Sequence, residues 1–276
     1  MTHAVTALRW LVFVVVALAM NVPVIVTLVT SLKTPGEISM NPSLWIDAPT
    51  LSNYARVFEI ADRFDAAGFL LNSLVASTFG AVAAIVLALP AAYAMARHGD
   101  GRRLLLPAIL NLRAVPLIIF AIPIYMMYQW LGLLDTRIGL GLILTIVNLP
   151  LALIMLVNAI DAVPAELDEA ARIDGAGLWT VLTRVTAPMC RAALAATLIF
   201  GFITAWNEFL FGLMLTTRSA VPMTVGASFF FAASGGGVDW GIAAAVMIIG
   251  ALPPTLLGLL MYRQIGRSLT SGAVKG

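Results

Sequence analysis

The sequence predicts an all-α, polytopic membrane protein with six transmembrane helices and one helical loop outside the lipid. The chain has 276 residues, of which 61% are hydrophobic and only 11% charged, and its mean hydropathy is +0.99. Several stretches reach the roughly 20 apolar residues that a helix needs to cross a bilayer. Between two of these stretches lies a polar segment, residues 164–188, which cannot be buried in lipid.

Six apolar stretches are long enough to be transmembrane spans, and we treat residues 1–276 as one transmembrane domain. The first stretch is too long for the apolar part of a signal peptide and is not followed by a good cleavage site. The second is longer than a span needs, so we expect its start to lie partly outside the membrane. The predicted spans are about 10–32, 67–96, 104–130, 138–160, 192–215 and 240–262.

Lysine and arginine residues indicate the orientation, because they are more frequent on the cytoplasmic side. With the N-terminus inside, ten of them are cytoplasmic and five lie outside. The cytoplasmic set is Arg9, Arg97, Arg102, Arg103, Arg172, Arg184, Arg191, Arg263, Arg267 and Lys275. The outer set is Lys33, Arg56, Arg63, Arg137 and Arg218. We therefore expect both termini, the loop 161–191 and the tail 263–276 to be cytoplasmic.

The polar segment reads PAELDEAARIDGAGLWTVLTRVTAP and predicts two short helices separated by a glycine. Pro164 suits the first turn of a helix, where its missing N–H is not needed. Arg172 lies near the other end, where a cation is favoured, and Gly175 can take a positive φ that ends the helix. Acidic residues in the first turns favour the positive end of the helix: Glu166, Asp168 and Glu169.

The second helix of this segment is predicted from one apolar stripe. Leu178, Leu182 and Val185 are spaced at i, i+4 and i+7, which places them on one helical face. Pro188 then interrupts the helix before the next apolar stretch.

A plain alternative is a solvated loop whose charges satisfy one another. Asp168 and Glu169 are spaced to pair with Arg172 along the helix, and each such pair contributes roughly 0.2–0.5 kcal/mol. This alternative does not account for the small apolar residues beside the carboxylates, which suit close packing into the groove of a partner. These residues are Leu167, Ala170 and Ala171.

Motifs of catalytic or metal-binding sites are not found. The sequence has no G-x-x-x-x-G-K-[ST], no H-E-x-x-H and no G-x-S-x-G. Its one cysteine, Cys190, excludes a disulfide within the chain, and its two histidines, His3 and His98, are far apart. We predict that the chain is not an enzyme, has no catalytic residues and binds no metal or cofactor, so that any ATP it depends on is bound by another subunit.

The order E-A-A, D-G-A and a proline nineteen residues after the glutamate resembles the coupling loop of bacterial ABC importer permeases. The sequence departs from the family at Ala187, where leucine is usual. The resemblance implies that this loop docks in a cleft of an ATP-binding subunit. The residues that it assigns to this contact are Glu166, Glu169, Ala170, Ala171, Asp174, Gly175, Ala176 and Pro188.

Other stretches resemble the carbohydrate-uptake, maltose-type branch of these permeases. They are Asn53-Tyr54 with Val57-Phe58, Leu131 to Thr136, Trp206 to Phe209, and Leu269 to Gly276. The resemblance implies a bacterial inner-membrane complex with a second similar permease, two ATP-binding subunits that hold ATP and Mg, and an extracytoplasmic solute-binding protein. No nucleic acid is implied.

The C-terminal tail is the last element with an implied role. In the maltose-type branch this tail reaches between the ATP-binding subunits, which implies contacts by Ser271, Gly272 and Lys275. The alternative is a frayed terminus without a partner.

Four polar residues within the spans are candidates for the solute path. Arg113 is the one cation inside the third predicted span, and Glu208 is the one carboxylate inside the fifth. Charged groups in a membrane face protein or water because lipid does not solvate them. Asn148 and Asn207 could supply hydrogen bonds to a hydroxyl-rich solute. Alternatively, Arg113 and Glu208 pair with each other or with backbone and only hold the helices together.

These observations favour the permease subunit of an ATP-driven, binding-protein-dependent importer for a sugar, polyol or sugar derivative. A related permease for amino acids, phosphate or another solute class would share the coupling loop. A self-contained secondary transporter is the third alternative. Against it stand the absence of inverted repeats and of a pair of ion-coupling carboxylates within the spans.

Overall fold

The computed structural model describes the backbone of residues 2–60, 64–232 and 238–272 and the side chains of residues 5–60, 64–111, 115–228 and 238–260. Every regular element in these ranges is a helix. The chain forms two compact units, which are described separately. The first contains residues 1–67 and 226–252, and the second contains residues 68–225 and 253–276.

The first unit begins with α1 (Thr2–Ser31), an apolar helix of 30 residues. Two short helices follow, α2 (Pro35–Met40) and α3 (Ser52–Glu59). Two buried polar side chains hold the connection between them. The Lys33 ammonium donates to the carbonyls of Asn41 and Ser43, and the Asn53 amide donates to the carbonyls of Ser31 and Lys33. Four backbone carbonyls around α2 are thereby paired within the unit.

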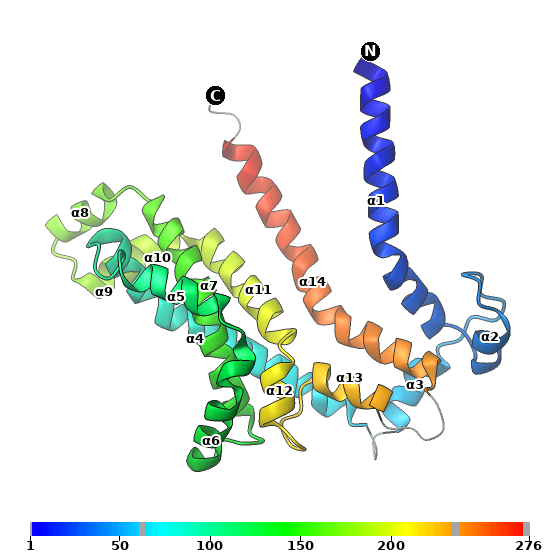
Figure 1. Cartoon of the computed structure of the whole chain (residues 1–276). Coiled ribbons are helices and arrows are strands. Elements are labelled where there is room, and N and C mark those ends of the chain that lie inside the picture. The colour runs from blue at the N-terminus through cyan, green and yellow to red at the C-terminus, as the bar shows by residue number, and fades with distance from the viewer. Residues whose placement is uncertain (1, 61–63, 233–237, 273–276) are drawn as a thin grey trace. The chain divides into compact units, whose positions relative to one another are not determined.

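The second unit is built around α4 (Ala66–Arg97) and α7 (Arg137–Asp161). Between them lie α5 (Leu105–Ala114), the 3₁₀ turn η1 (Leu117–Phe120) and α6 (Ala121–Leu131). After the short helices of the polar segment come α11 (Arg191–Trp206) and α12 (Leu210–Leu215). Figure 1 shows α8, α9 and α10 gathered at one end of α7 and α11, with α6 and α12 at the other end.

Two helices contain residues of both units. Helix α13 spans Met223–Ala232, and α14 spans Trp240–Gly272 with Pro253 and Pro254 inside it. The backbone of α14 stays helical beyond the predicted end of the sixth span at residue 262.

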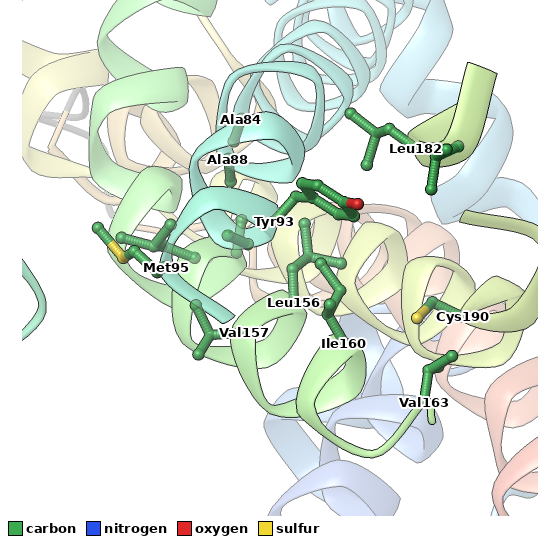
Figure 2. Close-up of a cluster of buried hydrophobic side chains, with 14 residues drawn as sticks. Ala84, Ala88, Tyr93, Met95, Leu156, Val157, Ile160, Val163, Leu182 and Cys190 are labelled. Carbon is green, nitrogen blue, oxygen red and sulfur yellow. The ribbon is translucent and has the colours of Figure 1, made fainter. Parts of the chain in front are cut away.

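Small residues bring α4 and α7 close together. Ala84, Ala88 and Ala92 recur at every fourth position of α4 and are buried in one apolar cluster with residues of α7 (Figure 2). A Cβ at Gly80 would lie 2.7 Å from the Cβ of Leu144, which is closer than two such atoms approach. A larger side chain at position 80 would therefore push the two helices apart.

The predicted spans agree with the helices in position, but the structure does not establish that there are six. Within the described residues, four helices are long and apolar enough to cross a membrane, namely Val5–Ser31, Ala66–Arg97, Arg137–Asp161 and Trp240–Leu260. A fifth span is counted if the helices Leu178–Met189 and Arg191–Trp206, bent by 81°, are taken together.

Two of the predicted spans are interrupted. The third is broken into α5, η1 and α6 around Pro116, which cannot donate a backbone hydrogen bond. The fifth is broken between Trp206 and Leu210. Hydropathy averages over such breaks, which is why the sequence predicted each span as one continuous helix.

Candidate functional site

The polar segment folds as the predicted helical hairpin. Its first helix, α8 (Glu166–Ile173), ends at Gly175, whose φ is +85°. The Ala176 N–H donates to the Ala171 carbonyl (2.9 Å), and the Gly175 N–H donates to the Arg172 carbonyl (3.0 Å). These two bonds satisfy the last carbonyls of the helix in the pattern that requires a left-handed residue at this place. The prediction of a positive φ at Gly175 is confirmed.

The second helix of the hairpin is continuous but irregular. It consists of α9 (Leu178–Val181), a π-helical turn η2 (Leu182–Thr186) and α10 (Ala187–Met189). The Ala187 N–H bonds to the Leu182 carbonyl, five residues back. Pro188 follows at once, and the wider turn makes room for its ring, which would clash with a carbonyl in a regular helix.

The predicted apolar stripe of this second helix is wrong. Leu182 is buried, but Leu178 is 54% exposed, and the buried residues beside Leu182 are Val181 and Thr186. Leu178 and Leu182 are joined by a regular helical hydrogen bond, so the exposure of Leu178 reflects a lack of packing partners at the start of the helix. The π turn begins at Leu182 and places Thr186, and not Val185, among the buried residues.

Asp168 is the buried centre of the hairpin, with 3% of the residue exposed. The Arg97 Nε, at the end of α4, donates to its Oδ2 (2.7 Å), and the Thr186 hydroxyl donates to its Oδ1 (2.9 Å). Arg97 Nη2 also donates to the carbonyl of Val163, between α7 and α8 (3.0 Å). One ion pair thus joins α4, the connection before α8, α8 itself and the π turn.

The alternative in which Asp168 pairs with Arg172 along the helix is therefore not seen among the described residues. Arg172 Nη2 instead donates to the hydroxyl of Tyr93 on α4 (3.2 Å). The i,i+4 rule compares residues along one helix, whereas Asp168 finds a partner 71 residues away in the sequence.

The outer face of the hairpin carries the remaining residues that the sequence assigns to a partner. Glu166, Glu169, Ala170, Asp174, Gly175 and Pro188 are exposed. Within the described part of the chain, no side chain pairs with Glu169. Large apolar residues are exposed on the same hairpin, with Ile173 at 87% and Trp179 at 66%. A face that combines free carboxylates with exposed apolar side chains is typical of an interaction surface.

The small residues of α8 and the following turn are divided between two sides. Ala171 and Ala176 are partly buried and pack against the apolar cluster that contains Tyr93, Ile160 and Leu182. Ala170 remains exposed. Only part of the predicted small-residue face is therefore available to a partner.

A second exposed ion pair lies at the same end of this unit. Arg102 and Asp161 form two parallel hydrogen bonds of 2.6 and 2.9 Å. Their side chains are 43% and 31% exposed, compared with 9% and 4% for Arg97 and Asp168. Water can replace either partner of the exposed Arg102–Asp161 pair, so this pair contributes less to stability than a buried one and can be compared with Arg97–Asp168.

Most of the candidate solute-path side chains form hydrogen bonds with backbone groups elsewhere in this chain. Asn148 is buried and donates to the Gly201 carbonyl on α11 (3.1 Å), while its Oδ1 is buried without a partner. Glu208 accepts hydrogen bonds from the N–H groups of Phe211 and Gly212 and so caps α12. The alternative that Glu208 is held by backbone is thus seen in the structure.

Asn207 is the candidate whose side chain is exposed, at the break between α11 and α12, and its amide donates back to the Ile203 carbonyl (2.9 Å). The side chain of Arg113 lies outside the described residues. The backbone of Ser271 and Gly272 belongs to α14, but their side chains and Lys275 also lie outside the described residues.

A hollow of about 430 Å³ lies within the second unit, between α4, α11 and the later part of α14. Its lining is apolar apart from one hydroxyl, so it offers a hydroxyl-rich solute few hydrogen-bond partners. The lining residues include Leu74, Thr78, Phe202 and Leu257. Within the described residues, no three His, Cys, Asp or Glu side chains are grouped to hold a metal ion.

Asp135, at the other end of the unit, was not predicted as a site residue. It has a φ of +54°, which aspartate tolerates better than most residues. Its carboxylate accepts hydrogen bonds from the backbone of the loop after α12, at distances of 2.9–3.1 Å. The donors are the N–H groups of Thr217, Arg218, Ser219 and Ala220. The only sequence signal was the resemblance of residues 131–136 to an outer turn.

The carboxylate of Asp135 also has a shifted pKa. Partial burial raises its pKa, but the four N–H donors outweigh burial and hold the pKa well below that of an ordinary aspartate. The Asp135 carboxylate therefore stays ionised over the whole physiological pH range and binds the loop after α12 in that form.

The fold and the hairpin define a class: a polytopic α-helical membrane protein with a polar helical hairpin between two of its apolar segments. Residues 80–271 match the family described as "Binding-protein-dependent transport system inner membrane component", and the chain belongs to this family. It is a permease subunit of an ABC importer.

Relatives and a solved structure agree with this membership. The chain is 31% identical to the sulfoquinovosyl glycerol transport system permease protein SmoH of Agrobacterium fabrum, over 92% of this chain and 88% of that protein. It is 34% identical to the trehalose/maltose transport system permease protein MalG of Thermococcus litoralis, over 82% of each. A chain of a bacterial ABC transporter involved in the import of alginate has the same fold, with a TM-score of 0.78, 21% identity and coverage of 95% and 96% of the two chains.

The positive φ of Gly175 predicts that Gly175→Ala destabilises the hairpin, because an L residue in the left-handed region costs about 1–2 kcal/mol. The change should lower the melting temperature of the purified importer and weaken its hold on the ATP-binding subunits in a co-purification assay. Gly177, with a φ of −71° and no atoms within 4 Å of an added Cβ, is the matched control. Equal tolerance of alanine at both positions would show that the helix end does not depend on Gly175.

The hydrogen bonds that the Asp135 carboxylate accepts predict a pH-dependent effect of Asp135→Asn. At neutral pH the variant should melt at a lower temperature, because the amide lacks the negative charge that four N–H groups surround. The folded pKa is depressed, so this stabilisation is full above the ordinary aspartate pKa of about 3.9 and declines as the pH falls below it. The difference in melting temperature between Asp135→Asn and the wild type should therefore stay constant from neutral pH down to about pH 4 and shrink only at more acidic pH, whereas Asp100→Asn, on an exposed turn, should match the wild type throughout. A difference that does not shrink between about pH 4 and about pH 2 would contradict the role of the charge.

Proposed function

We propose that the chain is one of two permeases of an importer for a sugar or sugar derivative. Support for the solute class comes from relatives at 30% identity or more, whose names refer to sulfoquinovosyl glycerol, diacetylchitobiose and trehalose/maltose. Two ATP-binding subunits hold ATP and Mg, and an extracytoplasmic solute-binding protein delivers the solute. Both termini lie in the cytoplasm, as the distribution of basic residues favours.

The observation that carries the mechanism is the division of α8 into a buried and an exposed carboxylate. Asp168 is held by its own chain, while the neighbouring Glu169 is exposed and has no partner within the described residues. We propose that the exposed face, with Glu166, Glu169, Ala170, Asp174 and Pro188, docks in a cleft of an ATP-binding subunit. Closure of that subunit on ATP then displaces the hairpin, and the hairpin displaces the spans attached to it.

The chain's own residues at the break of α11 contribute to the solute path in this proposal. Glu208 caps α12 and Asn148 ties α7 to α11, so both position the break. Asn207 is exposed at that break and offers its amide to passing hydroxyl groups. Arg113 and the tail residues Ser271, Gly272 and Lys275 remain assigned by sequence alone, the first to the path and the others to the ATP-binding subunits.

The solute class is tested on the binding protein encoded with this chain. Calorimetric titration with mono- and disaccharides, polyols, amino acids and phosphate should show binding of a carbohydrate only. Its ligand should then stimulate ATP hydrolysis by the reconstituted importer. Tight binding of an amino acid or of phosphate would overturn the assignment to sugars while leaving the permease family unchanged.

The docking face predicts that Glu169→Lys uncouples or disassembles the importer, because it replaces attraction to a basic group of the partner by repulsion. Loss of a buried charge contact across an interface costs about 2–5 kcal/mol. Co-purification and solute-stimulated ATPase activity measure this effect. Asp100→Lys makes the same change of charge on an exposed turn and should leave both unchanged. Normal assembly and normal solute-stimulated ATPase activity of the Glu169→Lys importer would contradict the proposed contact.

The exposed amide predicts that a cysteine at position 207 reacts with a small aqueous thiol reagent, in a Cys190→Ser background. Solute and binding protein should slow the reaction. A cysteine at the buried position 148 should react far more slowly and serves as the control. Absence of labelling at 207 in every nucleotide state, with transport retained, would remove Asn207 from the path.

A further inference from the structure

We propose that the buried Arg97–Asp168 ion pair makes the end of α4 and the hairpin α8–α10 move as one body, so that the hairpin drives α4 directly. This inference rests on the proposed function, because it concerns how displacement of the hairpin reaches the spans. It assigns Arg97 and Asp168 as positioning residues for transport. Neither belongs to the exposed face that docks on the partner.

The covalent chain leaves α4 without a direct connection to the hairpin. The hairpin is continuous with α7 on one side and α11 on the other, so both helices follow its displacement through the backbone. Helix α4 ends at Arg97 and continues into α5, away from the hairpin in sequence. It can follow the hairpin only through side-chain contacts.

Three kinds of contact join α4 to the hairpin: apolar packing, the hydrogen bond from Arg172 Nη2 to the Tyr93 hydroxyl (3.2 Å), and the Arg97–Asp168 ion pair. Apolar side chains of α4, among them Tyr93, pack in one cluster with Val181 and Leu182 of the hairpin. Such contacts are non-directional and allow one surface to slide over the other. The ion pair is directional, with an Nε–Oδ2 distance of 2.7 Å and side chains that are 9% and 4% exposed.

Separation of the ion pair would be far more unfavourable than sliding of the apolar contacts. Little water reaches the pair, whose side chains are 9% and 4% exposed, so moving Asp168 away would leave two largely buried charges uncompensated. The pair is also held on both sides, since Arg97 donates to the Val163 carbonyl and Asp168 accepts from Thr186. A force on α8 therefore reaches α4 at the guanidinium before the pair breaks.

The first test compares two asparagine variants at the same end of the unit. Asp168→Asn removes the charge of the buried pair, and Asp161→Asn does the same to the exposed Arg102–Asp161 pair. In the reconstituted importer, Asp168→Asn should retain basal ATP hydrolysis but lose its stimulation by loaded binding protein by about tenfold, within the range of coupling between distant sites. Asp161→Asn should behave as the wild type.

A purely structural role predicts a different pattern. It would lower the melting temperature, assembly, basal hydrolysis and stimulated hydrolysis together. An assembled Asp168→Asn importer with normal stimulation and normal import per ATP would overturn the proposal. The wild-type complex separates the two hypotheses: absence of ATP-driven sugar import there contradicts the proposed function, whereas stimulation of hydrolysis by the binding protein does not depend on the identity of the solute.

The second test leaves the ion pair intact and does not depend on the folding of a charge variant. Spin labels are placed on two exposed residues in a Cys190→Ser background, Asp100 just beyond α4 and Thr183 in the second helix of the hairpin. Their distance, measured by pulsed electron paramagnetic resonance, should be the same in the nucleotide-free and ATP-bound complexes. The distance from Thr183 to Arg218, at the far end of the unit, should change between these states. A change in the Asp100–Thr183 distance would overturn the single-body movement.

Discussion

A lipid bilayer offers no hydrogen-bond partners, and the structure depends on this constraint wherever a helix is interrupted. At the break between α11 and α12, the Glu208 carboxylate accepts hydrogen bonds from N–H groups in the first turn of α12, which have no partner within that helix. The Asn148 amide reaches from α7 to the Gly201 carbonyl on α11. The N–H groups at the start of α12, which a soluble protein would leave to water, are here bound by a side chain of the same chain, so that Glu208 is held in place for a structural reason before any solute is present.

Long-range carboxylate contacts then place the short helices. Helices of fewer than ten residues are not stable alone, so α8 and α12 depend on tertiary contacts for their existence. At one end of the second unit, Asp168 ties α8 to Arg97 on α4. At the other end, Asp135 holds the loop after α12 through four backbone donors. Each carboxylate organises a segment whose own apolar surface is too small to fix its position.

Local physics explains which features the sequence predicted and which it did not. The hairpin and the positive φ of Gly175 were predictable, because a glycine between two short amphipathic segments acts on its immediate neighbours. The partner of Asp168 was not predicted, because the helical spacing rule compares only near neighbours and Arg97 is 71 residues away. The π turn was not predictable from the spacing of apolar residues, so the buried residues of the second helix were assigned wrongly. Hydropathy could not locate the breaks in the third and fifth predicted spans. The docking of the hairpin on a partner stays a prediction, since it depends on a surface that this chain does not carry.

The adjacent carboxylates of α8 show how one short helix can connect two bodies. Successive residues of an α-helix point about 100° apart, so Asp168 can face its own protein while Glu169 faces outward. The inner carboxylate is enclosed by Arg97 and Thr186, and the outer face keeps its charge and its exposed Ile173 for a partner. A helix that was loosely attached to its own chain would absorb a partner's movement by rotating about its axis. In the proposed mechanism the buried ion pair opposes that rotation, so that the strength of the inner contact would set how much of the partner's displacement reaches the spans.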